Sequence, residues 1–283
     1  MSGEVAGRIA LITDASACIP SSHLSRIDLR VVPINVQRGD EGFRSGVDLD
    51  DRRLYRALEQ GLPVKSSAPS PIDYLDAIEE AGDVPCVIIT PATEFTRMYT
   101  NASLAAELAG RSVTVVDSRS ATAGHGLVVL AAAEARDAGG QPDDVVAAAE
   151  EAASRAELVA CLETLEYLRQ SGRVPALALG LANQLGIRPV FRLRNGTAER
   201  LGLPRSEQSA LGRIVREWRA GGGPQGRRTA VFHAARPELA GELARMVGEV
   251  SFITEFSAAM AIHTGPGVVG VAWLRPSDGE LAL

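Results

Sequence analysis

The chain has 283 residues, a formal net charge of -6 and a hydrophobic fraction of 46%, whereas aromatic residues make up only 4%. This composition is typical of a soluble globular protein with an aliphatic core. The mild acidity argues against binding to a nucleic acid backbone, and the scarcity of aromatic residues argues against a stacking surface for single strands.

Short aliphatic runs alternate with helix-like segments in the first half of the chain. A short apolar run is typical of a buried parallel strand. The helix at 71–81 has a clear start, because Ser70 suits the N-cap and Pro71 the first helical position. We predict strands at residues 9–13, 31–36, 86–90 and 113–117, and helices at 50–60, 71–81, 100–108 and 125–138. This alternation predicts an α/β domain with a doubly wound parallel sheet that helices cover on both faces.

The pattern changes after a helix predicted at 142–155, and we place a domain change near residue 155. Asn195 and Gly196 separate two strand-like runs and suit a two-residue turn, which predicts a hairpin. In chain order we predict a strand at 158–162, a helix at 163–169, an apolar segment at 176–185 that is buried or lines something apolar, and the hairpin at 189–201. A helix at 207–219, a flexible loop at 221–228, a strand at 229–234, a helix at 237–248 and strands at 250–254 and 267–274 follow. The sequence therefore predicts an N-terminal domain of residues 1–155 and a second α/β domain of residues 156–283, with a mixed or antiparallel sheet.

Small hydroxyl side chains gather in three predicted loops at strand ends, residues 13–20, 65–70 and 90–96. The carboxyl ends of the strands in a parallel sheet form one crevice, and ligands bind there. Hydroxyl groups and helix N-terminal amides at this edge suit an anion such as a carboxylate or a phosphate. Helix capping is the structural alternative, because Ser and Thr are common N-caps.

The segment 262–267 is a fourth candidate and contains His263, Thr264 and Gly265. Its two glycines around a proline predict a tight turn where the backbone can approach a ligand closely. His263 can pair with an anion, although a lone histidine more often has a structural role. Arg173 follows a helix that ends at Gly172. It is either an anion-binding residue or a surface arginine that interacts with the helix dipole.

Cys18, Cys86 and Cys161 are odd in number and widely spaced, which argues against a disulfide framework or a zinc site. We expect free thiols in a reducing cytoplasm. The N-terminus lacks the pattern of a signal peptide, and no apolar run approaches the ~18 residues of a membrane span. We therefore expect a cytoplasmic protein with no metal, no other cofactor, no nucleic acid partner and no stable membrane insertion.

In chain order these segments resemble the motifs of the DegV family, the bacterial fatty-acid-binding proteins. The resemblance extends from Thr13 to Leu274, and the ordered set of motifs is specific although no single piece is. The matching segments are residues 13–17, 32–34, 44–48, 66–70, 92–99, 116–118, 165–174, 185–189 and 262–267. The resemblance implies two domains that hold a long-chain fatty acid between them.

The resemblance also implies that the protein is not itself an enzyme. It would present the acyl carboxylate to a separate ATP-dependent fatty acid kinase, which makes an acyl phosphate. By position, the residues near the carboxylate would be Ser66, Thr93, Thr96 and His263, and we add the flanking Thr264 and Gly265 to the ligand site. Arg173 and Arg205 match family arginines expected near the surface of phosphoryl transfer, facing the partner.

The chain departs from the family pattern at several positions. Serine and threonine are exchanged at Ser66, Thr93 and Thr96, which keeps a hydroxyl group at each. Arg97 replaces a glycine and would crowd a backbone that approaches a ligand, and Cys18 replaces an aspartate. The basic residues after the hairpin are fewer, which weakens the expectation of kinase docking more than that of lipid binding.

Three functions follow from the sequence, and lipid binding is the one we favour. A lipid tunnel needs aliphatic residues, and the candidates are Leu177, Leu179, Leu181, Leu185, Ile187, Met260 and Ile262. The alternative is a doubly wound α/β hydrolase or transferase that uses a Ser or Thr hydroxyl with His263. Against it, the sequence has no GxSxG nucleophile motif, no GxGxxG after the first strand and no GxxxxGK[ST] phosphate loop. The third is a scaffold or regulator whose crevice is vestigial.

Overall fold

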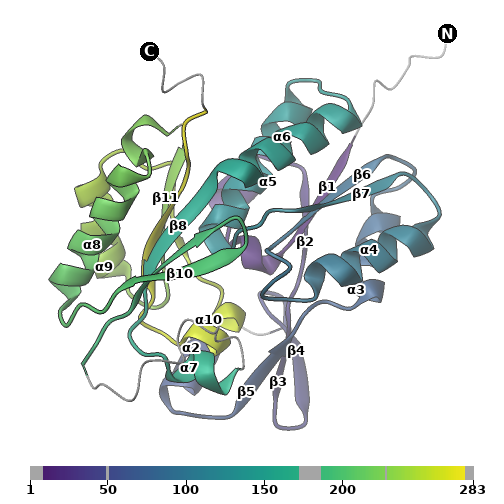
Figure 1. The fold of residues 1–283 in the computed structure, drawn as a ribbon. Helices are drawn as coiled ribbons and strands as arrows, with labels where there is room; N and C mark the ends of the chain where they lie inside the picture. The colour runs from purple at the N-terminus through teal and green to yellow at the C-terminus, as the bar shows by residue number, and fades with distance from the viewer. Residues whose placement is uncertain (1–8, 49–50, 172–185, 227, 278–283) are drawn as a thin grey trace.

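Two β-sheets lie side by side, with helices between them and on their outer faces (Figure 1). The computed structural model describes residues 9–48, 51–171, 186–226 and 228–277. Figure 1 places the first sheet and its helices at the right and the second sheet with α8 and α9 at the left.

The first sheet has four parallel strands in the order β2-β1-β6-β7. Its strands are β1 (Ala10–Asp14), β2 (Leu29–Val32), β6 (Cys86–Thr90) and β7 (Val113–Asp117). Side chains alternate between the two faces: Ile12 and Ile88 pack with α3 (Pro71–Glu80) and α4 (Met98–Ala109), whereas Leu11 and Val87 pack with α5 (Thr122–Asp137). The continuous apolar runs of β1 and β6 follow from burial on both faces.

The second sheet has six strands in the order β10-β9-β8-β13-β11-β12. They are β8 (Ala156–Cys161), β9 (Val190–Arg194), β10 (Thr197–Gly202), β11 (Arg228–His233), β12 (Phe252–Glu255) and β13 (Val269–Leu274). The pair β11 and β12 is parallel and the other neighbours are antiparallel, so the sheet is mixed. The α5 helix and α6 (Pro142–Arg155) lie between the two sheets, and α8 (Glu207–Ala220) and α9 (Pro237–Val247) cover the outer face.

A third, antiparallel sheet with the order β4-β3-β5 lies at the bottom of Figure 1. It consists of β3 (Asn35–Arg38), β4 (Glu41–Arg44) and β5 (Val64–Ser67). The nearby helices are α2 (Asp51–Glu59), α7 (Glu166–Gln170) and α10 (Ala258–Thr264), and short turns form at η1 (Ala15–Ala17), α1 (Ser21–Leu24) and η3 (Gly223–Gln225).

This small sheet corrects two predictions. The strand predicted at 31–36 is wrong, because β2 ends at Val32 and β3 starts at Asn35 in a different sheet. Pro33 between them has no backbone N–H for a sheet hydrogen bond, which explains the break. The loop predicted at 65–70 begins in β5, where Ser66 pairs with Val36 of β3.

The predicted α/β class, with a parallel first sheet and a mixed second sheet, is confirmed. The boundary predicted near residue 155 falls where α6 leads directly into β8, and the division into two domains stays a prediction.

Two long-range hydrogen bonds connect the first third of the chain to its end. The Tyr55 hydroxyl donates to the Phe256 carbonyl oxygen at 2.6 Å, and the Thr254 hydroxyl donates to the Cys18 carbonyl oxygen at 2.6 Å.

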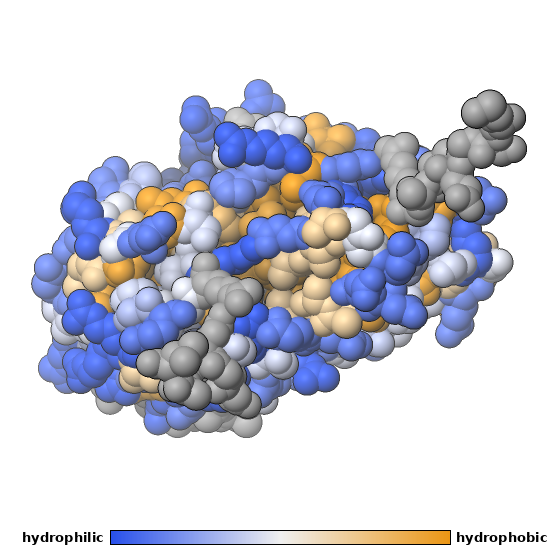
Figure 2. Space-filling model, turned by 90° about the horizontal axis from the view of Figure 1, so that it is seen from above, coloured by the Kyte–Doolittle hydropathy of each residue, from blue (hydrophilic) through white to orange (hydrophobic). Residues whose placement is uncertain are grey.

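Seen from above, the surface is mostly hydrophilic, with smaller groups of apolar side chains between the polar ones (Figure 2). Within the described ranges, no helix has both the length and the apolar character needed to cross a membrane.

His233 gives a test of how stability depends on pH. Its side chain is buried at the end of β11, and its Nδ1 accepts a hydrogen bond from the Arg236 backbone N–H at 3.3 Å. Burial lowers the pKa of His233 in the folded protein. The unfolded chain therefore binds the proton first as the pH falls below its ordinary pKa of about 6.5, so stability is lost with acidification.

Between pH 7.5 and 5.5 we expect acidification to cost the wild-type protein more melting temperature than it costs His233→Asn. Asparagine can place an acceptor oxygen near the position of Nδ1 without titrating. Melting curves of both proteins across this range are the measurement. If the melting temperatures of the wild type and the variant changed equally with pH, His233 would not contribute to the pH dependence of stability.

Candidate functional site

A cavity of about 220 Å³ lies where the two large sheets and the small sheet meet. It is far larger than the ~10–15 Å³ that one water molecule needs, so it has room for an organic ligand. Its wall combines η1, β5, the loops after β6 and β7, one face of β8 to β11, and α10. Residues from both halves of the chain therefore contribute to a single cavity.

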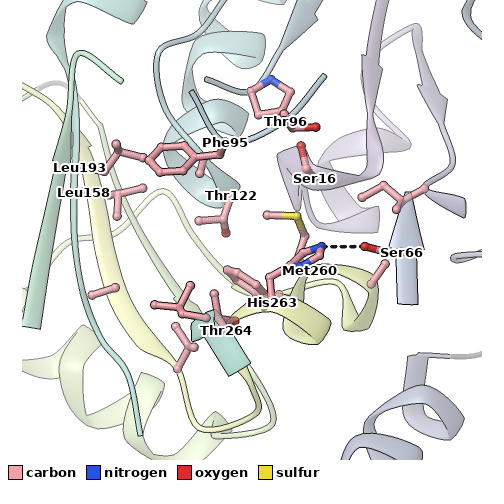
Figure 3. A pocket seen from close by; sticks show the side chains of 18 of the residues that line it. Ser16, Ser66, Phe95, Thr96, Thr122, Leu158, Leu193, Met260, His263 and Thr264 are labelled. Atoms are coloured by element: carbon pink, nitrogen blue, oxygen red, sulfur yellow. Dashed lines mark hydrogen bonds between the residues drawn. The ribbon is translucent and has the colours of Figure 1, made fainter. Parts of the chain in front are cut away.

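One side of the cavity is apolar because alternate side chains of β8 and β9 point to opposite faces of the sheet. Leu158 and Ala160 of β8, with Leu162 just beyond it, and Phe191 and Leu193 of β9 all lie on the face of the second sheet toward the cavity. Their neighbours Val159, Cys161 and Val190 pack on the opposite face with α8 and α9. Figure 3 shows Leu158 and Leu193 together on one side. This wall suits a hydrocarbon chain.

The polar end is formed by Ser66 and His263, which are far apart in the sequence. Ser66 Oγ lies 2.7 Å from His263 Nε2, and the histidine tautomer decides which atom donates. Both side chains lie on the cavity wall, as Figure 3 shows. The turn predicted around His263 is partly wrong, because residues 258–264 form α10 and the turn begins only at Gly265.

Thr96 and Thr264 also line this cavity, so the structure brings four of the predicted site residues together. The Thr264 hydroxyl donates to the Gly265 carbonyl oxygen at 3.3 Å. Gly265 is buried beside the cavity with φ of 79°, and a Cβ there would lie 2.3 Å from the Tyr167 ring. Glycine is needed at this position because both the backbone conformation and the ring exclude a side chain.

The remaining predicted residues lie elsewhere. Thr93 is exposed, is not among the residues that line the cavity, and donates its hydroxyl to Asp117 Oδ2 at 2.7 Å. Arg205 is exposed just before α8, and Arg173 lies outside the described residues. Arg97 is exposed at the start of α4 and does not crowd the cavity. The roles assigned to all of these residues stay predictions.

Of the aliphatic residues predicted to line a lipid tunnel, some lie on the cavity wall and others do not. Met260 lies on the cavity wall, whereas Ile187 and Ile262 are buried but are not among the residues that form it. The other four candidates lie outside the described residues, namely Leu177, Leu179, Leu181 and Leu185.

A fully buried polar network behind the wall escaped the sequence analysis. The Ser16 hydroxyl donates to Asp14 Oδ1 and lies 3.3 Å from His125 Nδ1, and His125 Nε2 lies 3.1 Å from both the Ile89 carbonyl oxygen and Thr13 Oγ1. Burial raises the pKa of Asp14 and lowers that of His125, because it disfavours both charged forms.

The partners of His125 come from distant parts of the chain: Ser16 and Thr13 are 109 and 112 residues away in the sequence, and Ile89 is 36 residues away. In the sequence, Gly126 is the residue that could have indicated this close packing around His125. A Cβ there would lie 2.5 Å from the Ala17 carbonyl oxygen, so this glycine lets α5 approach η1 closely. Ser16 itself reaches the cavity wall, and the network therefore fixes one part of that wall.

The family model and the relatives that match this chain all point to the same protein family. A model of that family, described as "uncharacterised protein, DegV family", matches residues 8–276. A DegV domain-containing protein of Streptomyces coelicolor is 33% identical over 274 residues, which cover 93% of this chain and 97% of the relative. One from Deinococcus radiodurans is 30% identical, with 93% of this chain and 97% of the relative covered.

Solved structures agree with this likeness. The structure described as "Fatty Acid Binding of a DegV family Protein from Thermus thermophilus" has a TM-score of 0.88 and 27% identity, and covers 95% of this chain and all of that one. A DegV family structure from Ruminococcus gnavus, refined with vaccenic acid, has a TM-score of 0.83 at 22% identity, covering 93% and 99% of the two chains. At that identity it supports the fold alone.

Proposed function

The chain belongs to the DegV family, and on this premise we propose that it binds a long-chain fatty acid in the central cavity. The observation that carries the proposal is the Ser66–His263 pair at one end of a cavity whose opposite wall is apolar. A buried carboxylate must be hydrogen-bonded, and these two side chains can donate to it. The acyl chain would then extend toward Leu158 and Leu193. The proposal includes no metal ion or other cofactor.

The energetics permit this ligand. Burial of a 16-carbon chain at about 0.8 kcal/mol per methylene contributes roughly 12 kcal/mol before losses. Association costs on the order of 4–15 kcal/mol. Net binding therefore requires a preformed cavity, and both large sheets contribute rigid strands or strand ends to this one.

We propose in addition that the protein presents the bound carboxylate to a separate fatty acid kinase and catalyses no step itself. Arg205 is exposed, as a residue that faces a partner must be. We also propose a cytoplasmic location, which agrees with the three buried, unpaired cysteines Cys18, Cys86 and Cys161.

A hydrolase or transferase is the second candidate, because the 2.7 Å contact of Ser66 Oγ and His263 Nε2 is also that of a nucleophile and its base. Such an enzyme would hydrolyse a long-chain ester, and Ser66→Ala would abolish turnover. A lipid-binding protein would show no turnover with or without this substitution. Assay of a chromogenic palmitate ester with both proteins separates the two candidates.

Fatty acid binding itself is tested on freshly purified protein. We expect denaturing mass spectrometry to release long-chain fatty acids, and delipidated protein to bind labelled palmitate and melt at a higher temperature with it, since the ligand binds only the native state. Ser66→Ala should weaken binding. Ser154→Ala is the matched control, because that hydroxyl is exposed on α6, away from the cavity. Absence of both released lipid and palmitate binding would contradict the proposal.

A further inference from the structure

The β9–β10 hairpin forms part of the cavity wall and lies at the edge of the second sheet. Leu193 and Ala198 pair across its two strands and both line the cavity. Because β10 is the edge strand, only β9 connects it to the rest of its sheet. β9 is itself paired with β8 from Val190 to Arg194, so the hairpin tip separates from the other half of the molecule without breaking these pairs when the loops opposite it move away.

The tip of this hairpin, Asn195 and Gly196, is docked on the other half of the molecule. The Gly196 backbone N–H donates to the Arg119 carbonyl oxygen at 2.8 Å. The Glu94 carboxylate lies directly over Gly196, where a Cβ would be 2.5 Å from either carboxylate oxygen. Figure 1 shows the hairpin reaching from the second sheet toward α5. The hairpin tip thus closes against the loops that follow β6 and β7.

The receiving loops are held in place by Asp117. Its Oδ1 accepts from the Arg119 backbone N–H at 2.7 Å, and its Oδ2 accepts from the Thr93 hydroxyl at 2.7 Å. Arg119 has φ of 50°, in the left-handed region that residues with a side chain rarely adopt. The Asp117 contacts hold this conformation, and the Arg119 carbonyl oxygen accepts the hydrogen bond from the hairpin tip. Thr93, although outside the cavity, therefore contributes to the docking point.

An apolar contact lies next to the docked tip. Phe95, the neighbour of Glu94, points toward Leu193 of the hairpin, as Figure 3 shows, and both residues line the cavity. The two halves therefore meet here through a polar contact at the hairpin tip and an apolar contact on the cavity wall. Leu193 is paired with Leu158 of β8, so separation of the hairpin tip from Glu94 and Arg119 would part Phe95 from Leu193 through movement of the loop that carries Glu94 and Phe95.

We propose that the hairpin tip is a latch whose release controls uptake and release of the ligand. This inference rests on the proposed function. The latch changes both rates together, because it closes the same passage for association and dissociation. Equilibrium affinity depends mainly on the cavity and the Ser66–His263 pair, so it stays nearly constant when the latch is weakened.

Charge at the hairpin tip provides the first test. Gly196→Asp places a carboxylate against Glu94, whereas Gly196→Asn has nearly the same shape and no charge, and both residue types tolerate positive φ. Release of a fluorescent long-chain fatty acid into excess palmitate is followed by stopped flow. We expect release from Gly196→Asp about fivefold faster than from Gly196→Asn, the size of effect that a pair of exposed charges produces. Adding Glu94→Gln should cancel this difference.

A reversible cross-link provides the second test and does not depend on weakening the fold. A Cβ at position 196 would lie 2.6 Å from Glu94 Cδ, so cysteines at 94 and 196 have Cβ atoms within about 5 Å, near disulfide geometry. The three native cysteines are buried and free. We expect the oxidised Glu94→Cys, Gly196→Cys protein to release the fatty acid at least about tenfold more slowly than its reduced form, since local opening is blocked.

Each outcome has a definite meaning. Equal release rates for Gly196→Asp and Gly196→Asn, or for the oxidised and reduced cross-linked protein, would overturn the latch while leaving fatty acid binding intact. Failure of the fluorescent fatty acid to bind the wild-type protein would instead contradict the proposed function. Unequal rates with unchanged affinity would support both.

Discussion

Replacing His263 by alanine is expected to weaken palmitate binding by about 100-fold, equal to about 2.7 kcal/mol. The substitution removes a hydrogen-bond donor at the polar end of the cavity, and a hydrogen bond to a charged group contributes about 1.5–3 kcal/mol. It also removes the partner of Ser66, whose Oγ lies 2.7 Å from His263 Nε2. Equilibrium titration of delipidated wild-type and variant protein with labelled palmitate is the measurement.

Two controls make this result specific to the carboxylate. His23→Ala removes a histidine whose ring lies 5.2 Å from that of Phe252, and neither residue lines the cavity. Palmitate methyl ester has no ionised head group, so its affinity should change much less in His263→Ala than that of palmitate. An unchanged palmitate affinity in His263→Ala would place the carboxylate at another end of the cavity.

Replacing Arg192 by methionine is expected to lower the free energy of unfolding by about 3–5 kcal/mol, because it leaves a buried carboxylate without its closest counter-charge. Glu157 of β8 is only 1% exposed, and its Oε1 lies 2.8 Å from Arg192 Nε. Arg192 also contacts Glu217 of α8 at 2.5 Å and Glu199 of β10 at 3.4 Å. One arginine therefore connects β8, β9, β10 and α8 on the outer side of the sheet.

The loss should depend on pH in a defined direction. Burial raises the pKa of Glu157 in spite of the nearby arginines, and removal of Arg192 raises it further. A raised pKa in the folded state means that the protonated form is tolerated, so the cost appears at neutral pH and decreases with acidification. Denaturant titrations at pH 7.5 and 5.0 test this. Glu157→Gln in the Arg192→Met background should recover most of the loss, and a loss below about 1 kcal/mol would identify the pair as an ordinary surface contact.

The elements with the strongest local signals were predicted well. The strands β6 and β7 have the predicted bounds, since their apolar runs are short, aliphatic and flanked by polar or small residues. Ser70 and Pro71 mark the start of α3 as expected, and Asn195 and Gly196 form the predicted turn with positive φ at both residues. In each case the chemistry of one or two residues decides the local structure.

The small sheet and the buried network depend instead on partners distant in sequence. Val64 to Ser67 is a strand because it pairs with β3, and no alternation within these four residues announces it. His125 has a polar environment only because α5 packs on η1. The candidate site shows the same limit: Ser66 and His263 are 197 residues apart, and the family resemblance indicated both whereas periodicity indicated neither.

The long-range construction of the cavity has a consequence for the order of folding. Its wall includes Ser16 near the start of the chain and Val268 near the end, and the Tyr55–Phe256 hydrogen bond spans 201 residues. During synthesis the parallel sheet can assemble early, but the cavity cannot close until its last segment has left the ribosome. Contacts this distant form late, and a nascent chain that has completed β8 and β9 exposes their apolar faces meanwhile. The cavity is therefore complete only when the segment around Val268 has been added, and we expect the exposed apolar faces of β8 and β9 to favour aggregation until then.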